Sequence, residues 1–296
     1  MTRSTYQPLD ITVDGDAVDV LREEIVDVGG VQTRYWEAGR GDPVILIHGG
    51  GAGADAYGNW AGCLPVFARQ FRTIAYDMVG FGRSEPLDET GFVYSQDARI
   101  QHLRALLDGL GLERVALVGN SMGGATALGL AMRQPERVSR LVLMGSAGLT
   151  HEFSPQLRTI LEYREPDRAG MRRIAEALTH STFKVGDELV EYRYRLTQTD
   201  EVMAAYRATT GWIQEAGGLY YDEADIAAVK VPTLIVSGRE DAVVPLQLSL
   251  RFHELLENSW LYCIPKCGHW AMIEHPHDFA TAACRFLEGG SGGERG

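Results

Sequence analysis

A serine stands between two glycines in the segment Gly119-Asn120-Ser121-Met122-Gly123. An apolar run precedes this segment, and residues 125–131, which are small and apolar, follow it, so the pattern is that of a strand, a tight turn and a helix. Such a turn holds a serine in a strained, exposed conformation, and glycines on either side let strand and helix approach closely. We therefore predict that Ser121 is a nucleophile rather than a serine in an ordinary turn.

A nucleophilic serine needs a base and an acid, and both have candidates later in the chain. Asp241 follows a buried-type strand, and His269 follows the last predicted strand. The order Ser121, Asp241, His269 is the one that the α/β-hydrolase arrangement requires. His269 would accept the serine proton, and Asp241 would orient and stabilise the imidazole. Glu240 is a weaker alternative for the acid.

An oxyanion hole needs two backbone donors near the nucleophile. The glycine loop His48-Gly49-Gly50-Gly51-Ala52-Gly53 follows an apolar strand, and the absence of a following Lys-Ser or Lys-Thr argues against a phosphate loop. We predict that the amides of Gly50 and Met122 form the oxyanion hole, with Gly49 and Gly51 facing the substrate. His48 is predicted to shape the loop by hydrogen bonding.

The elements that must position these residues alternate between strand and helix. Strands are predicted at residues 22–28, 31–38, 43–47, 71–77, 115–118, 138–144, 231–237 and 260–264, and the clearest helices at 94–109 and 276–287. This alternation predicts an α/β-hydrolase fold, with a mostly parallel sheet that carries helices on both faces.

The alternation of strands and helices stops in residues 149–221, where charged stretches that favour helices occur without a clear buried strand. We expect a helical cap there, a core formed by residues 1–148 and 222–288, and a disordered glycine-rich tail at 289–296. The cap aromatics could pack in the cap or line a pocket, and packing is the safer prediction for any one of Tyr192, Tyr194, Tyr206 and Trp212.

The composition is that of an ordinary globular domain, with 296 residues of which 45% are hydrophobic. A net charge of -12 argues against a nucleic-acid or anionic membrane surface. No apolar run is long enough to cross a bilayer, and residues 1–7 lack the apolar centre of a signal peptide, so we expect a cytoplasmic protein.

Cysteine usage indicates no zinc site and no disulfide framework, because the four cysteines have no paired spacing. Cys267, two residues before His269, is predicted to be a small buried side chain rather than a nucleophile. No metal or organic cofactor is indicated.

Four segments together resemble the meta-cleavage product hydrolases, over about residues 24–287. They are the glycine loop with Asn59, Ser84 after Gly-Phe-Gly-Arg, Gly119-Asn120-Ser121-Met122-Gly123-Gly124, and Cys267-Gly268-His269-Trp270. These α/β-hydrolase-fold enzymes cut carbon–carbon bonds in vinylogous 1,5-diketones made by ring-opening of catechols. Ala52 departs from the proline that the family often carries, which removes no backbone donor.

The resemblance implies substrate-binding roles beyond the triad. Asn59, Asn120, Trp270 and a cap arginine would hold the dienoate end of the substrate. Arg193 fits that arginine, although Arg195 lies two residues away and would face differently on a helix. The resemblance also suggests a homodimer or a higher homo-oligomer.

The expected reaction is hydrolysis of a 2-hydroxy-6-oxohexa-2,4-dienoate to 2-hydroxypenta-2,4-dienoate and a carboxylic acid. A carboxylesterase or lactonase would use the same triad, and only Asn120 and Trp270 favour carbon–carbon cleavage over it. A receptor that binds a ligand without turnover is a second alternative. The substituent on the distal carbonyl is not specified by any motif.

Overall fold

The computed structural model describes residues 12–13, 16–17, 21–85 and 92–289. Residues 290–296, which make up nearly all of the expected disordered tail, lie outside the described part, as do most of residues 1–20. The architecture below therefore concerns the predicted core and cap.

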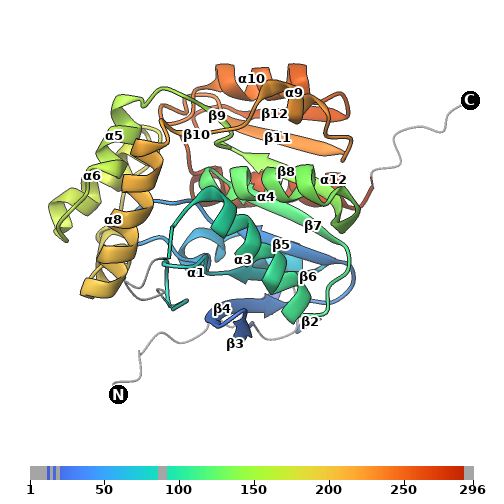
Figure 1. The fold of residues 1–296 in the computed structure, drawn as a ribbon, viewed down its shortest axis with the longest axis horizontal. Helices are drawn as coiled ribbons and strands as arrows, with labels where there is room; N and C mark the ends of the chain where they lie inside the picture. The colour runs from blue at the N-terminus through green and yellow to red at the C-terminus, as the bar shows by residue number, and fades with distance from the viewer. Residues whose placement is uncertain (1–11, 14–15, 18–20, 86–91, 290–296) are drawn as a thin grey trace, which may run out of the picture.

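An eight-stranded sheet forms the centre of the molecule, with strand order β12-β11-β8-β7-β5-β6-β4-β3 (Figure 1). Pairs involving β4 are antiparallel and all other pairs are parallel. The strands of this sheet are β3 (Arg22–Val28), β4 (Val31–Ala38), β5 (Pro43–Ile47), β6 (Arg72–Tyr76), β7 (Val115–Asn120), β8 (Val138–Met144), β11 (Thr233–Gly238) and β12 (Ser259–Ile264). The predicted mostly parallel sheet is confirmed, and every predicted strand is present.

The core helices pack on both sides of this sheet, with α3 and α4 together in front of it and α12 behind it in the view of Figure 1. Ser95 caps α3 by accepting a hydrogen bond from the amide of Ala98 at 3.1 Å. The core helices are α1 (Ala56–Trp60), α2 (Leu64–Ala68), α3 (Gln96–Gly109), α4 (Met122–Arg133), the 3₁₀ turn Pro135–Arg137, α9 (Glu223–Ala227), α10 (Leu246–Leu255), α11 (Ala271–Glu274) and α12 (Pro276–Leu287).

Four helices between residues 150 and 219 form the segment expected to be a cap, and α5, α6 and α8 stand together at one end of the sheet in Figure 1. Their bounds are α5 (Pro155–Leu161), α6 (Arg168–Leu178), α7 (Asp187–Arg195) and α8 (Asp200–Glu215). A short antiparallel pair, β9 (Leu149–Thr150) with β10 (Leu219–Tyr220), joins the start of this segment to its end. This pair was not predicted, because two residues are too few for a periodic pattern. A second two-residue pair, β1 (Thr12–Val13) with β2 (Asp16–Ala17), precedes the sheet.

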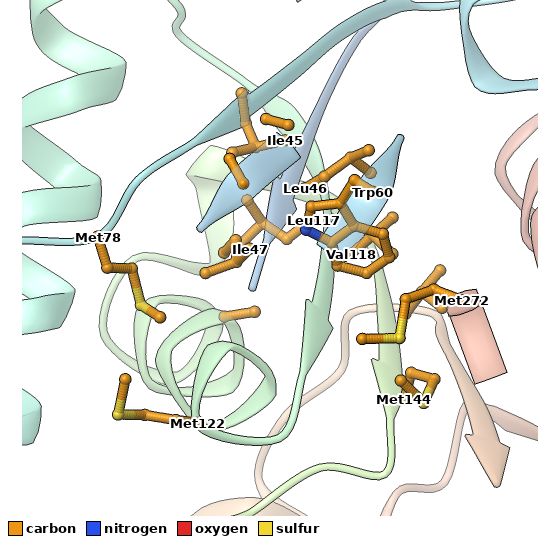
Figure 2. Packing of buried hydrophobic residues seen from close by; sticks show 14 of the residues in the cluster. Ile45, Leu46, Ile47, Trp60, Met78, Leu117, Val118, Met122, Met144 and Met272 are labelled. Carbon is orange, nitrogen blue, oxygen red and sulfur yellow. The ribbon is translucent and has the colours of Figure 1, made fainter. Parts of the chain in front are cut away.

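Central strands are apolar along their whole length because both of their faces are buried. Leu46 of β5 and Leu117 of β7 have no exposed surface, and Figure 2 shows these strands packed with Trp60 of α1. Each such side chain contributes roughly 1.5–3 kcal/mol when it leaves water. The resulting rigid sheet places the carboxyl ends of β5, β7, β11 and β12 along one edge, where the predicted site residues follow.

Candidate active site

Ser121 lies at the sharp turn between β7 and α4, as predicted. Its backbone has φ 55° and ψ −118°, in the left-handed half of conformational space that non-glycine residues rarely adopt. The amide of Ser121 donates to the carbonyl of Met144 at 3.1 Å, and its carbonyl accepts from the amides of Ala125 and Ala147. These bonds from β8 and α4 hold the strained residue in place.

Close backbone contacts explain the two glycines that flank the serine. A Cβ atom on Gly119 would lie 2.4 Å from the carbonyl oxygen of Gly123. A Cβ atom on Gly123 would lie 2.4 Å from the carbonyl oxygens of Ile47 and His48. Since all of these neighbours are backbone atoms, no side-chain adjustment could relieve the clash, and the predicted need for glycine is confirmed.

His269 and Asp241, the predicted base and acid, lie in contact with each other. Nδ1 of His269 lies 2.8 Å from Oδ2 of Asp241, and both side chains are buried. The other carboxylate oxygen of Asp241 accepts from the amides of Val243 and Val244 at 2.8 and 2.9 Å. The carboxylate is thus fixed by the backbone on one side and orients the imidazole on the other.

Glu240, the alternative acid, points elsewhere. Its carboxylate accepts from the amide of Cys267 at 3.3 Å and lies 3.5 Å from the guanidinium of Arg239. The structure therefore pairs Asp241, and not its neighbour, with His269. Cys267 itself is buried, and burial raises the pKa of its thiol, which disfavours the thiolate that a nucleophile would need.

His48 shapes the glycine loop, as predicted. Nδ1 of this fully buried side chain lies 2.7 Å from the carbonyl oxygen of Gly49, and Nε2 accepts from the amide of Met78 at 2.9 Å. Burial lowers the pKa of His48 to about 4, so the ring is neutral near pH 7. A neutral ring that donates through Nδ1 and accepts through Nε2 satisfies both of these contacts.

The two predicted oxyanion-hole residues lie against each other. A Cβ atom on Gly50 would meet the Sδ and Cε atoms of Met122 at 2.8 and 2.9 Å. Both residues line the same cavity as Ser121 and His269, together with Gly49 and Gly51. Gly50 thus lies beside the residue that follows the nucleophile, where the second backbone donor of an oxyanion hole is required.

Arg193 of α7 enters this cavity, whereas Arg195 does not. Arg193 is 1% exposed, and its guanidinium donates to the carbonyl of Ala52 at 2.8 Å and weakly to Asn59 Oδ1 at 3.5 Å. Its Nε has no partner in the described part of the chain. Arg195 is exposed and pairs with Glu191 at 2.9 Å. The geometry resolves the choice between the two arginines in favour of Arg193 as a cavity residue.

Aromatic stacking and burial both act on Arg193. Its guanidinium carbon lies 4.7 Å from the centre of the Trp270 ring, which is also buried. Burial lowers the pKa of Arg193 to about 10, and Asp55 opposes that effect. The side chain remains a cation at neutral pH, although among the described residues no carboxylate contacts it.

Asn120 and Asn59 are both buried residues that line the cavity. The amide nitrogen of Asn120 donates to the carbonyl of Met144 at 3.1 Å, while its Oδ1 has no partner within residues 21–85 and 92–289. Asn120 therefore has a buried acceptor without a partner among the described residues, while its amide nitrogen is engaged by Met144.

The rest of the cavity wall is apolar. Residues 149–221 contribute Phe153, Leu157, Ile160, Leu161, Leu178, Ile213 and Leu219, and the rest of the chain contributes Ala54, Ala147, Val243 and Val244. None of these was singled out from the sequence, because an apolar residue on an amphipathic helix has the same pattern whether it lines a cavity or a core. The four cap aromatics named in the sequence analysis are absent from this wall in the described structure, which agrees with the prediction that they pack elsewhere.

No described helix is both long and apolar enough to cross a membrane. Likewise, residues 21–85 and 92–289 contain no group of three His, Cys, Asp or Glu side chains that could hold a metal ion.

Comparison with known proteins matches residues 42–276 to the alpha/beta hydrolase fold family. A serine hydrolase involved in carbazole degradation has a solved structure that superposes with a TM-score of 0.83 at 47% identity, covering 91% of this chain and 99% of the other. A meta-cleavage product hydrolase from Pseudomonas fluorescens superposes with a TM-score of 0.84 at 35% identity, covering 90% and 97%.

Curated relatives give the same result at the level of sequence. The 2-hydroxy-6-oxo-6-(2'-aminophenyl)hexa-2,4-dienoic acid hydrolase of Metapseudomonas resinovorans is 50% identical over 90% of both chains. The 2-hydroxy-6-oxo-2,4-heptadienoate hydrolase of Pseudomonas putida is 38% identical over 89% of this chain and 95% of that one. Identity of this extent, together with the shared fold, shows that the chain belongs to the meta-cleavage product hydrolases, α/β-hydrolase-fold enzymes that hydrolyse a carbon–carbon bond.

Proposed function

We propose that this chain hydrolyses a 2-hydroxy-6-oxohexa-2,4-dienoate with an aryl group on the distal carbonyl, and that it releases 2-hydroxypenta-2,4-dienoate and an arenecarboxylic acid. The observation that carries the proposal is Arg193, a buried cation in the cavity that holds Ser121 and His269. A cation without a carboxylate contact, in a wall that is apolar over most of its remaining area, favours a substrate with an anionic end and an apolar end.

The aryl group that we propose is 2'-aminophenyl, so that the acid released is 2-aminobenzoate. Support comes from the relative with 50% identity, whose name specifies that substrate. The apolar side chains of the cap and core, such as Phe153 and Val244, suit a planar aromatic ring.

The dienoate end is assigned to the polar residues of the cavity. Arg193 would bind the substrate carboxylate with Asn59 beside it, while Trp270 flanks the guanidinium. The acceptor Oδ1 of Asn120 suits the hydroxyl group on carbon 2. Gly49 and Gly51 complete the wall without side chains.

Carbon–carbon cleavage requires that the dienol first becomes a ketone, because a carbanion leaves readily only when a conjugated carbonyl accepts its electrons. In our proposal His269 assists this movement of a proton to carbon 5. Ser121 then attacks the carbonyl carbon 6 and gives its proton to His269, while the amides of Gly50 and Met122 stabilise the oxyanion.

Collapse of the oxyanion breaks the bond between carbons 5 and 6. The electron pair passes into the conjugated carbonyl and gives the dienolate, which takes the proton from His269 and leaves as 2-hydroxypenta-2,4-dienoate. The acyl group remains on Ser121, and His269 is again a neutral base. Water, deprotonated by His269, releases the carboxylic acid and restores the serine. One water is consumed, and no oxidant or cofactor enters the balance.

The test is the loss of visible absorbance of the 2'-aminophenyl dienoate, with 2-aminobenzoate identified as a product. The Ser121→Ala variant should lose at least about 10⁴-fold in kcat but still bind the substrate. Full turnover by that variant would refute the assignment. Rapid hydrolysis of 4-nitrophenyl esters with the dienoate left intact would favour the esterase alternative, and absence of any turnover would favour a receptor.

Three broader features belong to the same proposal. Residues 149–221 act as a cap on a core formed by residues 1–148 and 222–288, which is supported by the run of helices α5 to α8 between β9 and β10. The protein is cytoplasmic, acts without nucleic acid or membrane, and forms a homodimer or a higher homo-oligomer. Size-exclusion chromatography with light scattering tests the assembly, and fractionation of cells tests the location.

A further inference from the structure

Asp55 joins the glycine loop to helix α7, the helix that carries Arg193. The hydroxyl of Tyr192, the residue before Arg193, donates to Oδ2 of Asp55 at 2.6 Å. The other carboxylate oxygen of Asp55 accepts from the amide of Gly58 at 2.7 Å and so caps helix α1. One carboxylate therefore contacts both α1, at its start, and α7, and each of these helices carries a residue of the cavity wall.

A buried arginine fixes Asp55 in turn. Arg34 of β4 donates to Asp55 Oδ2 at 2.8 Å and to Asp77 Oδ2 at 2.7 Å, and all three side chains are buried. Burial alone would lower the pKa of Arg34, but Asp77 and Asp55 outweigh it and raise the pKa, so the guanidinium stays charged. Charge-assisted bonds of this kind are stronger and more directional than neutral ones.

The charges around Asp55 also favour a cation nearby. Within this buried group two carboxylates, Asp55 and Asp77, face one guanidinium, and Glu23 approaches Arg34 only from the half-exposed rim at 3.3 Å. The excess negative charge opposes the effect of burial on Arg193, for which Asp55 is the foremost favourable neighbour. The carboxylate of Asp55 thus partly offsets the unfavourable burial of the Arg193 charge, although it does not contact the Arg193 guanidinium.

Direct packing fixes the backbone of Arg193 from a second side. A Cβ atom on Gly53 would lie 2.2 Å from the carbonyl oxygen of Arg193, so the glycine loop and α7 touch without an intervening side chain. Asn59, which lies one turn along α1 from Asp55, donates its amide to the Asp55 carbonyl at 3.2 Å. The two polar groups assigned to the substrate carboxylate, Arg193 and Asn59, are therefore both held relative to Asp55.

We propose that Tyr192 and Asp55 are positioning residues, whose hydrogen bond holds Arg193 of the cap against Asn59 of the core in the geometry that binds a carboxylate. This inference rests on the proposed function and specifies how the carboxylate site is assembled across the two parts of the chain. It predicts that the hydrogen bond matters for substrates with a carboxylate and not for neutral substrates cleaved by the same serine.

The variant that tests it is Tyr192→Phe, which removes only the hydroxyl. Tyr194→Phe is the matched control, because it makes the same change two residues along α7, where the ring lies against Arg168 and outside the cavity wall. Tyr192→Phe should raise KM for the dienoate roughly 10-fold with a smaller change in kcat. Tyr194→Phe should leave both constants for the dienoate within about twofold of wild type. With 4-nitrophenyl butyrate, both variants should have KM and kcat within about twofold of wild type. An equal loss on the neutral ester would mean general damage to the fold and would overturn the proposal.

A double-mutant cycle shows whether Tyr192 acts through Arg193. In an Arg193→Met background, Tyr192→Phe should cause no further rise in KM, because the group that it positions is gone. An independent, additive loss in that background would contradict the proposal.

Binding measured without cleavage separates this inference from the proposed reaction. In the Ser121→Ala background, Tyr192→Phe should raise Kd for the 2'-aminophenyl dienoate about 10-fold. Binding is measured by the change in absorbance of the dienoate when it binds. A wild-type enzyme that binds but does not cleave this compound would refute the reaction and leave the positioning role supported. An unchanged Kd, or no binding of the dienoate at all, would overturn the positioning role.

Discussion

Replacing Arg193 by Met should separate stability from activity in this protein. Methionine has a similar length but no charge, and it leaves the cavity wall apolar. For most large side chains that are 1% exposed, as Arg193 is, substitution destabilises the fold by several kcal/mol. Here we expect a different result, because the charge of Arg193 is itself unfavourable to the folded state in the absence of substrate.

The magnitude follows from the environment of the guanidinium. Burial lowers the pKa of Arg193 to about 10, which corresponds to roughly 3 kcal/mol against keeping the charge in the folded protein. Loss of the donor leaves the Ala52 carbonyl unpaired, at about 1–3 kcal/mol, and loss of the stacking on Trp270 removes about 0.5–2 kcal/mol. These opposing terms are similar in size, so the free energy of unfolding should change by no more than about 2 kcal/mol.

Activity should respond in the opposite way. Removing one partner of a buried, hydrogen-bonded charge pair costs about 2–5 kcal/mol, so kcat/KM for the dienoate should fall by at least about 30-fold. Arg195→Met is the matched control, because that arginine is exposed and outside the cavity wall. Arg195→Met should change neither the free energy of unfolding nor kcat/KM for the dienoate.

Thermal denaturation and kinetics with the 2'-aminophenyl dienoate measure the two effects on the same preparations. A Tm shift within about 4 °C together with the loss of kcat/KM is the expected outcome. A fall in Tm of more than about 10 °C would show that Arg193 is a structural cation, and a normal KM would show that it does not bind the carboxylate. Either result would refute the reasoning.

Three further predictions concern the elbow, the triad and the buried histidines. Gly123→Ala should destabilise the protein by about 3 kcal/mol or more in thermal denaturation, since its Cβ would meet backbone oxygens at 2.4 Å, whereas Gly211→Ala in α8, with nothing within 4 Å, should stabilise it slightly. Asp241→Asn should lower kcat about 10³- to 10⁴-fold with KM nearly unchanged, because the imidazole loses the partner that fixes its tautomer, and a kcat near wild type would contradict that role. Burial lowers the pKa of both His48 and His102 to about 4 from an ordinary value of 6.5, so between these pH values only the unfolded chain binds their protons. The free energy of unfolding should therefore fall by about 1.4 kcal/mol per pH unit for each histidine as pH decreases through that window, and His102→Gln should reduce the slope measured by urea unfolding at pH 7 and pH 5.

Much of the site could be predicted because local sequence carried its signals. The strand before Ser121 is a continuous apolar run, and the glycines beside it occupy positions where even a methyl group would clash with backbone. Asp241 and His269 each follow a strand of the same parallel sheet, so their meeting at one edge follows from the fold.

Choices between neighbouring residues could not be made from the sequence. Glu240 and Asp241 are adjacent and chemically alike, and only the path of the loop after β11 points the second toward His269. The apolar cap residues that line the cavity, such as Phe153, have no distinguishing pattern, because burial against a ligand and burial against a core require the same side chains.

The fold class and the family could be predicted from the sequence, as could the candidates for nucleophile, base and acid, because each rests on element type, motif and spacing along the chain. Only the folded chain shows that Arg193 and Asn120 line the same cavity, and that Tyr192 reaches Asp55 across 137 positions of the chain. The physical reason is that local spacing specifies strands, turns and helices, whereas the direction of a polar side chain depends on which distant segment packs against it.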